Sequence, residues 1–451
     1  MKDLLFDVAD RASRYIEGLS GRRTSPSSEA VEQLRLLDVP LQNESIESAS
    51  VLAELDEIGS PATVTSTGGR FFGFVVGGCL PAAMMANWLA GVWDQNAAYK
   101  VLSPVAVALE EIGLKWLISL FGLPSSAGAG FVTGATMANF SGLAAARHAL
   151  LAQEGWEVEA KGLFGAPPIT VIVGEEVHVS VLKALSMLGL GRDRVVRVPV
   201  DRQGRMRADA LPQISGPTIV CIQAGNVNTG AFDPAEEICR TAKESGAWVH
   251  VDGAFGLWAL ATPGRAHLAR GIQDADSWAT DAHKWLNVPH DSGIVFVREP
   301  KHLRTAMAAS AAYLIEGDGR DPCHYVPEFS RRGRGIEIWA ALRSLGRSGL
   351  AEQIERTCNY ASQFAKGLRA AGYDILNDVV LNQVLVSFGS EDLTRRVIRR
   401  VQEEGTCWLG GTKWQGHVAM RISVSCWATT TEDVQRSLDV ILRIASEEAR
   451  V

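Results

Sequence analysis

The residue most suited to covalent chemistry is Lys284, within the run TDAHKW at 280–285. This run directly follows an apolar stretch at 277–280 that predicts a buried strand. Apolar surroundings disfavour the charged form of a lysine, and the neutral amine attacks aldehydes. The neighbouring His283 can donate a hydrogen bond to a phosphate. Taken alone, however, a Lys-His pair after a strand fits a surface position equally well.

A carboxylate, Asp252, ends a second buried stretch, WVHVD at 248–252. A buried carboxylate is costly unless it has a partner, so the position calls for a cation. A protonated pyridine nitrogen is a suitable one, because the carboxylate keeps the ring protonated and the ring then accepts electrons. The alternative is an aspartate that only caps the following turn.

Three further strand ends carry small or polar residues. The run GATMAN at 134–139 precedes a long helix whose free N–H groups favour a phosphate, and Thr136 adds a hydroxyl; an ordinary helix cap gives the same pattern. His178 opens a helix, where its ring either stacks on an aromatic cofactor or simply packs. Asn226 lies in a polar loop that also fits any tight turn. Together, five strand ends supply the parts of a cofactor site.

The elements that position these residues alternate along the chain. Short apolar strands separated by helices predict a mainly parallel sheet with helices on both faces. Ligands bind such sheets at the carboxyl ends of the strands. The predicted strands are Ile169–Val173, Thr218–Ile222, Trp248–Val251, Ser277–Thr280 and Ile294–Val297, and the predicted helices are Asn139–Gln153, Val179–Leu188 and Pro234–Glu244.

The pattern divides the chain into three parts. Residues 1–65 are amphipathic and predict a helical arm that packs on the main body or on a second subunit. Residues 66–325 form the large α/β domain. The basic run SRRGR then leads into a helix at Ile336–Leu345, and 326–451 predict a smaller α/β domain with strands at Gln383–Phe388 and Met420–Ser423.

Composition excludes several classes of protein. The net charge is −7, from 44 basic and 51 acidic residues, which argues against a nucleic-acid partner. The uncharged stretch at 71–93 is broken by Gly73 and Pro81, so we expect a buried strand, a turn and a helix there rather than a membrane span. No metal site or disulfide framework is expected, and reduced thiols indicate a cytoplasmic protein. The seven scattered cysteines are Cys79, Cys221, Cys239, Cys323, Cys358, Cys407 and Cys426.

The runs WVHVDGA at 248–254 and DADSWATDAHKWL at 274–286 resemble the group II decarboxylases that depend on pyridoxal 5′-phosphate (PLP). The best-known members of this family act on aromatic amino acids and glutamate. The resemblance covers roughly 69–430, with supporting matches at 70–73, 103–104, 134–139 and 178–183. It implies the type I PLP fold and a homodimer with its active site near the subunit interface.

The resemblance also implies a role for eight residues around the cofactor. Lys284 forms a Schiff base with the aldehyde, Asp252 pairs with the pyridine nitrogen, and His178 stacks on the ring. The remaining residues hold the phosphate (Ala135, Thr136 and His283) or border the ring (Ala254 and Asn226).

Two departures from the family pattern bear on the chemistry. The phosphate turn continues as Ala135-Thr136-Met137, without the carboxylate that the family usually carries there. The mobile loop at 314–329 has Pro322 where the family has a tyrosine that protonates the product carbon. Tyr325 is our candidate for this acid, with His324 as the alternative. If neither serves, oxygen can intercept the reaction and give an aldehyde instead of an amine.

The substrate side is less specific. By resemblance, Phe74 and Val75 shape the side-chain pocket, with Asn96 and Tyr99 near the contribution of the partner subunit. These types favour an aromatic or apolar L-amino acid, converted to its amine and CO2. The alternatives are oxygen-dependent aldehyde formation, a PLP-dependent carbon–carbon lyase and a non-catalytic PLP-binding protein. Three arginines fit surface charges or domain-interface pairs better than carboxylate binding: Arg332, Arg334 and Arg421.

Overall fold

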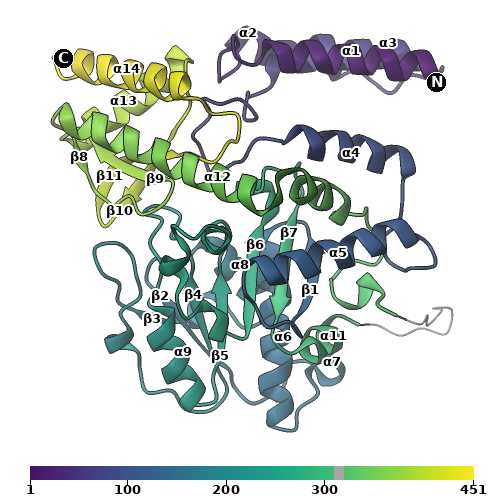
Figure 1. The fold of residues 1–451 in the computed structure, drawn as a ribbon, viewed down its shortest axis with the longest axis vertical. Coiled ribbons are helices and arrows are strands. Elements are labelled where there is room, and N and C mark those ends of the chain that lie inside the picture. Colours follow the sequence, from purple (N-terminus) through teal and green to yellow (C-terminus); the bar gives the residue numbers. More distant parts are fainter. Residues whose placement is uncertain (309–318, 451) are drawn as a thin grey trace.

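The computed structural model describes residues 1–308 and 319–450 and is built around a seven-stranded sheet (Figure 1). The strand order is β1-β7-β6-β5-β4-β2-β3, and β7 runs antiparallel to both of its neighbours. The remaining pairs are parallel. The strands are β1 (Gly128–Val132), β2 (Thr170–Gly174), β3 (Val196–Val198), β4 (Thr218–Gln223), β5 (Trp248–Asp252), β6 (Ser277–Asp281) and β7 (Gly293–Val297).

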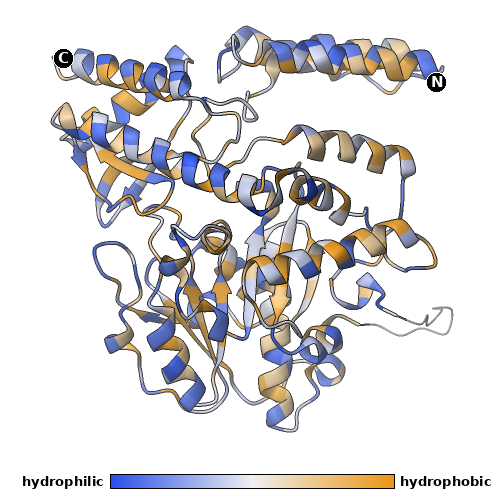
Figure 2. Cartoon of the chain, in the orientation of Figure 1, coloured by the Kyte–Doolittle hydropathy of each residue, from blue (hydrophilic) through white to orange (hydrophobic). Residues whose placement is uncertain are grey.

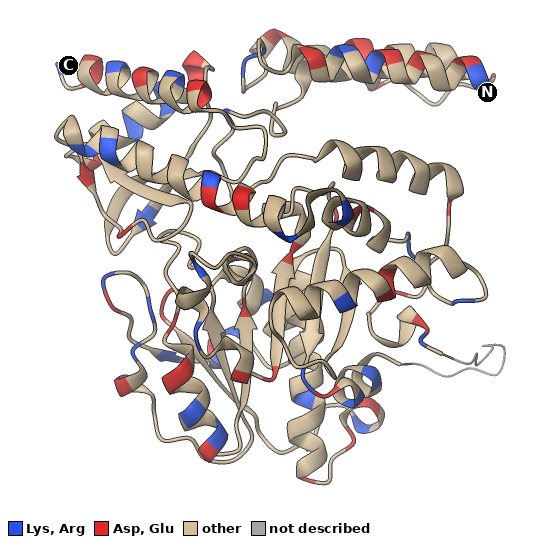
Figure 3. Cartoon of the chain, viewed as in Figure 1, with Lys and Arg blue, Asp and Glu red and all other residues tan. Residues whose placement is uncertain are grey.

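Five of the strands, β1, β4, β5, β6 and β7, are buried along their whole length because both faces of the sheet are covered, and Figure 2 shows hydrophobic residues in the sheet and in the helices around it. In β4, Val220 and Ile222 enter one hydrophobic core, while Ile219 and Cys221 enter the core on the other face. Charged residues lie mainly on the outer helices (Figure 3). The covering helices are α5 (Pro104–Leu120), α6 (Ala135–Gln153), α8 (Val179–Met187), α9 (Ala235–Glu244) and α11 (Pro300–Met307), with the short helices α7 (Val158–Lys161) and α10 (Ala282–Trp285) in the loops.

These elements confirm the predicted fold class. The five predicted strands are found with ends that differ by one residue, and α6 begins at Ala135 rather than at Asn139. The segment at 71–80 was expected to hold a strand, but Phe71 makes only a single bridge, with Trp408. The helix expected after it is α4 (Pro81–Trp93).

A second, antiparallel sheet of order β10-β11-β9-β8 forms the core of the C-terminal part. The long helix α12 (Gly335–Ala370) joins the two parts, because Ile338 packs in the large core and Phe364 in the small one. Gly346, with φ 61°, kinks this helix. The other elements are β8 (Asp374–Ile375), β9 (Gln383–Ser387), β10 (Gly410–Trp414), β11 (His417–Ser423), α13 (Glu391–Glu404) and α14 (Thr431–Glu448).

The N-terminal arm lies across one end of the body, above α4 (Figure 1). It consists of α1 (Lys2–Gly18), α2 (Ser28–Gln33) and α3 (Ser48–Glu54), and none of these helices has a buried residue in the single chain. Apolar side chains on the arm and on the neighbouring α4 are exposed: Phe6 of α1 is 60% exposed and Val92 of α4 is 68% exposed. Among the described residues, no helix is both long and apolar enough to cross a membrane.

Candidate active site

The carboxyl ends of the parallel strands bring the predicted residues to one edge of the sheet. Strands β4, β5 and β6 lie side by side, and Gln223 is paired with Asp252 and Asp252 with Ala279. Beyond the strand ends, the backbone N–H of Asp281 donates to Ala254 at 2.9 Å. The segments that carry Asp252 and Lys284 are therefore neighbours, as parallel pairing requires.

Lys284 lies in the loop that joins β6 to β7 at this edge. Its Nζ is 2.9 Å from Oδ2 of Asp281, whose side chain is only 3% exposed. The loop is closed by backbone bonds, since the N–H groups of Ala282 and His283 both donate to the carbonyl of Ser292. The ammonium group is thus held by a buried carboxylate three residues earlier in the chain.

Asp281 was missed by the sequence analysis and proves to be a central contact of the site. Its Oδ1 accepts the N–H of Ala135, at the N-terminus of α6, at 2.5 Å, and lies 3.7 Å from Nε2 of His283. The signal was present, because Asp281 ends a buried strand as Asp252 does. The same cost of burying an unpaired carboxylate applies to both.

A glycine allows a second segment to approach the lysine. A Cβ at Gly77 would collide with the carbonyl oxygen of Lys284. The next residue, Gly78, donates its N–H to Oδ1 of Asn287 at 2.6 Å. The segment at 71–80 is therefore fixed against the backbone of the lysine loop.

Asp252 and His178 face the same space as Lys284. Asp252 is 5% exposed, and its Oδ1 accepts the N–H of Ala254 at 3.2 Å. Burial lowers the pKa of His178, and the charges of Asp252, Lys284, Arg421 and Asp281 all act on its ring. Among the described residues, Asp252 has no ion pair, which leaves a buried carboxylate in need of a cation.

The phosphate end of the expected site is only partly as predicted. His283 lies beside Gly134, because a Cβ there would be 3.4 Å from Cε1 of His283. Burial lowers the pKa of His283 to about 4, and its Nδ1 accepts the N–H of Ser292 at 3.2 Å, so Nε2 carries the proton. Thr136 follows in the first turn of α6. The N–H of Ala135 is already bound to Asp281, so it is not an open phosphate donor.

The remaining polar residues of the site are Asn226 and Arg421. Asn226 accepts the N–H of Asn228 at 2.9 Å, while its own Nδ2 is buried without a hydrogen-bond partner within the described chain. Arg421, on β11, donates to Oδ1 of Asn228 at 3.3 Å and to the carbonyl of Val227 at 3.4 Å. Burial lowers the pKa of Arg421, and no carboxylate within 1–308 or 319–450 pairs with it. By contrast, Arg332 and Arg334 are ion-paired, as predicted, with Glu337 and Asp291.

These features fit PLP. A protonated ring nitrogen would give Asp252 its missing cation, and the N-terminus of α6 with His283 offers donors to a phosphate. Nδ2 of Asn226, which has no partner within the described chain, and the cation of Arg421 are further groups in need of ligands. The residues present therefore suit a group that combines a pyridinium, an aldehyde and a phosphate.

Among the described residues, no hydrogen bond, ion pair or ring contact joins Phe74, Val75 or Asn96 to Lys284. Phe74 is 64% exposed and stacks on Trp408, with ring centroids 5.2 Å apart, whereas Val75 is buried in the core. Asn96 accepts the N–H groups of Ala98 and Arg331, and the ring of Tyr99 lies 6.5 Å from that of His324. Their assignment to the substrate stays a prediction.

Tyr325, the candidate acid, lies at the outer strand of the sheet. Its ring is 4.0 Å from the guanidinium of Arg320, and its carbonyl borders Gly130 of β1. Pro322 is buried in a short turn at 322–324. Residues 314–318 of the predicted loop lie outside the described residues. In this single chain, Tyr325 contacts Arg320 and Gly130, whereas Lys284 contacts Asp281.

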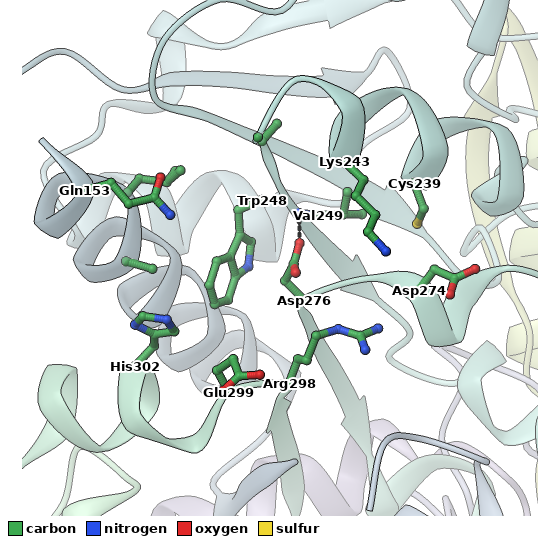
Figure 4. A pocket seen from close by; sticks show the side chains of 14 residues that line it. Gln153, Cys239, Lys243, Trp248, Val249, Asp274, Asp276, Arg298, Glu299 and His302 are labelled. Carbon is green, nitrogen blue, oxygen red and sulfur yellow. Dashed lines mark hydrogen bonds between the residues drawn. The ribbon is translucent and has the colours of Figure 1, made fainter. Parts of the chain in front are cut away.

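A cavity of about 310 Å³ opens at the opposite edge of the sheet (Figure 4). It is lined by charged residues, including Lys243, Asp276 and Arg298, and by Trp248. Trp248 is the first residue of β5, whereas Asp252 is the last. This cavity is therefore separated from the candidate site by the length of the strands.

The comparisons with other proteins agree with this geometry. Residues 31–389 match the family model described as the pyridoxal-dependent decarboxylase conserved domain. An aromatic-L-amino-acid decarboxylase of Bacillus atrophaeus is 26% identical over 403 residues, which cover 84% of this chain and 81% of that protein. A cysteine sulfinic acid decarboxylase of Mus musculus is 29% identical over 371 residues, covering 79% and 74%. The structure of Oryza sativa TDC with PLP and tryptamine has the same fold, with a TM-score of 0.91 at 21% identity over 99% of this chain and 97% of that one.

Proposed function

The chain belongs to the pyridoxal-dependent decarboxylase family, and from this premise we propose that it converts an aromatic or apolar L-amino acid into its amine and CO2. The cofactor, PLP, and the class, a carboxy-lyase, follow from the family. The residue assignment rests on one observation: the charges of Lys284 and of the unpaired Asp252 both act on the ring of His178.

Each residue has a separate task in this proposal. Lys284 holds the cofactor through its aldehyde, Asp252 keeps a proton on the ring nitrogen, and His178 covers one face of the ring. Thr136 and His283 hold the phosphate. When bound, PLP supplies a conjugated ring that accepts the electron pair left as CO2 departs.

Asp281 and Arg421 extend the proposed set. Asp281 orients Nζ of Lys284 at 2.9 Å. The sequence favoured a surface charge or a domain-interface pair for Arg421, but this residue is a partly buried cation without a carboxylate among the described residues. We therefore assign it to the carboxylate that all amino-acid substrates share. A bidentate contact of this kind would fix the orientation of the bond to be broken.

The substrate is tested directly with a panel of amino acids. Purified protein with PLP is incubated with aromatic, apolar and acidic L-amino acids, including cysteine sulfinic acid, and CO2 and amine are measured together. The proposal expects the highest kcat/KM with an aromatic or apolar substrate. A preference for an acidic side chain would overturn the substrate assignment, and no CO2 from any member would overturn the activity.

A second candidate is oxygen-dependent conversion to an aldehyde, favoured by Pro322 at the position of the family's tyrosine. In this reaction the amino acid, O2 and water give the aldehyde, CO2, ammonia and hydrogen peroxide. Oxygen is reduced to the peroxide while the carbon bearing the amine is oxidised. Assays under air and under nitrogen separate the two, because only the aldehyde route consumes oxygen and releases peroxide.

The exposed arm supports a homodimer. The apolar surfaces of α1 and α4 include Phe6, Trp88 and Val92, which are 60%, 37% and 68% exposed in the single chain. Covering such side chains is favourable by about 25 cal/mol for each Å² removed from water. Light scattering coupled to gel filtration measures the mass, and a monomer at micromolar concentration would contradict this assignment.

A further inference from the structure

A line of buried hydrogen bonds runs from β5 through α6 to His178. Nε1 of Trp248 donates to Oγ of Ser277 at 2.8 Å, and the same Oγ lies 2.8 Å from Nδ1 of His250. Nε2 of His250 lies 2.9 Å from Oδ1 of Asn139. The line continues from Nδ2 of Asn139 to Oγ of Ser180 at 3.2 Å and from there to Nδ1 of His178 at 2.7 Å.

The direction of the protons along this line is fixed by its members. The amide oxygen of Asn139 can only accept, so Nε2 of His250 carries a hydrogen. Burial lowers the pKa of His250 to about 3, so the ring is neutral and its Nδ1 accepts from Ser277. The amide nitrogen of Asn139 can only donate, so the hydroxyl of Ser180 is free to donate to His178.

The opposite direction would leave a proton unused. If the Asn139 amide were reversed, Nδ1 of His250 would donate to Ser277, which already accepts from Trp248. The hydroxyl hydrogen of Ser277 would then have no acceptor in the line, although Ser277, His250 and Asn139 are all 0% exposed. A buried donor without an acceptor is costly, so the stated direction is preferred.

The last member of the line determines the state of His178. Its Nδ1 accepts two hydrogen bonds, from the hydroxyl of Ser180 at 2.7 Å and from the backbone N–H of Ser180 at 3.2 Å. A neutral imidazole that accepts at Nδ1 carries its hydrogen on Nε2. The ring nitrogen that points away from Ser180 is therefore a donor.

We propose that Trp248, Ser277, His250, Asn139 and Ser180 are positioning residues that hold His178 with its hydrogen on Nε2. This inference rests on the proposed function in one respect, that His178 faces the substrate. The charged groups around the ring are Asp252, Asp281, Lys284 and Arg421. Among them, His178 then offers a hydrogen-bond donor and no lone pair.

The consequence is control over which bond of the substrate breaks. A lone pair on Nε2 would act as a base, breaking the Cα–H bond, taking its proton and leaving the electron pair to the cofactor. A solvent proton could then return to Cα, so the amino acid would exchange its α-hydrogen without losing CO2. A donor on Nε2 cannot take that proton, so loss of the carboxylate remains the open route.

The tautomer is measured first, by ¹⁵N NMR of histidine-labelled protein with PLP, using His178→Gln to identify the signals. We expect an unprotonated Nδ1 and a protonated Nε2 at pH 7. Nδ1 protonated in the unmodified protein would overturn the inference. This measurement does not depend on turnover, so it stays informative even if no amino acid is decarboxylated.

Asn139→Asp tests the line itself. A carboxylate of the same shape still accepts from His250 but cannot donate to Ser180, so the hydroxyl of Ser180 turns towards the introduced carboxylate and leaves His178. We expect the protonated Nδ1 form to appear and the α-hydrogen exchange of recovered substrate in D2O to rise about tenfold. An unchanged tautomer together with unchanged exchange would refute the role of the line.

Ser180→Ala is the smaller change, and it keeps the test open if Asn139→Asp does not fold. It removes the shorter of the two hydrogen bonds to Nδ1 and leaves the longer one from the backbone N–H, so it should raise the exchange by less than Asn139→Asp does. Ser180→Thr restores the hydroxyl and should reverse the rise. The matched control is Ser141→Ala, because Ser141 is a buried hydroxyl on α6, the helix of Asn139, and donates only to the carbonyl of Met137. Equal exchange in Ser180→Ala and Ser141→Ala would contradict the proposal.

Discussion

Partly or fully buried charged residues lie at both ends of the strands of the central sheet, which we call the amino edge and the carboxyl edge. The two edges differ in how these residues are hydrogen-bonded. At the amino edge, Asp276 accepts the N–H of Val249 at 2.8 Å, and Arg298 donates to the carbonyl of Ala275 at 2.9 Å. Burial raises the pKa of Asp276, and the charge of Arg298 opposes that shift. At the carboxyl edge, the side-chain hydrogen bonds of Asp252 and Arg421 among the described residues are 3.2 to 3.4 Å long.

The difference shows which edge is built to bind a charged ligand. The amino edge has the cavity of Figure 4, but two of its charged groups, Asp276 and Arg298, already have short hydrogen bonds to the backbone. The carboxyl edge has charged groups that need partners. Unsatisfied buried charge therefore locates the candidate site better than the presence of a cavity does.

The largest effect is expected for Lys284→Ala. Removal of the amine prevents the covalent bond to the cofactor aldehyde, so CO2 release should fall by at least about 10³-fold. The visible absorbance of the bound cofactor should be lost as well. Lys243→Ala, at the other edge, is the matched control, and a retained absorbance band in Lys284→Ala would show that another lysine is used.

Asp252→Asn is expected to lower kcat by about 10²-fold. The amide keeps the shape but cannot keep the ring nitrogen protonated, so the ring accepts electrons less well. The measurement is the rate of CO2 release at saturating substrate, with cofactor content determined in parallel. Asp276→Asn should leave both unchanged; an equal loss in the two variants would erase the contrast between the edges.

Arg421→Met should raise KM about tenfold with a smaller change in kcat, because a charge-assisted contact to the substrate carboxylate is lost. Arg421→Lys should recover part of the loss. Steady-state kinetics on the preferred amino acid provide both constants. Unchanged KM in Arg421→Met would remove this residue from the substrate site and leave it as a contact between the two parts of the chain.

The pH dependence of the free energy of unfolding tests the state of His250, which lies on β5 between the amino edge and the carboxyl edge. Its pKa in the folded protein is about 3, against about 6.5 when unfolded, so the unfolded chain binds one more proton between these values. The free energy of unfolding should therefore fall by about 1.4 kcal/mol per pH unit from this group as pH drops below 6.5. Urea unfolding at several pH values should give a shallower slope in His250→Gln, and equal slopes would contradict the assigned state.

The smallest effect is expected at the amino edge itself. Arg298→Met removes a hydrogen bond to the carbonyl of Ala275, so a modest loss of stability of about 1 kcal/mol is expected. The kcat/KM should change less than about twofold, because the substitution lies across the sheet from Lys284. A change in kcat/KM of tenfold or more would show that the two edges are coupled.

Much of the fold was predictable because the strands are buried on both faces. The apolar runs of β4 and β5 are unambiguous, and the residues after them were identified from the rule for parallel sheets. The reversal of β7 was not predicted, since an apolar strand carries no mark of its direction. The exposed strand β10, with its alternating burial, was also missed.

The site residues that follow strand ends were predicted, but Asp281, three residues before Lys284, and the long-range hydrogen bonds of the site were missed. Lys284 and Asp252 end neighbouring strands, so their meeting followed from the order of elements. The bonds of Asn139 to Ser180 and to His250 join residues 41 and 111 positions apart, which no local pattern reveals.

The closed loop between β6 and β7 has a consequence for how the lysine withstands thermal fluctuation. Both ends of this loop continue directly into paired strands, and Ser292 ties its backbone to Ala282 and His283. Opening it would require the ladder itself to separate, which in most proteins coincides with global unfolding. The amide hydrogens of Ala282 and His283, which donate to the carbonyl of Ser292, should therefore rank among the slowest to exchange with solvent. Lys284 therefore lies in one of the last parts of the molecule to unfold.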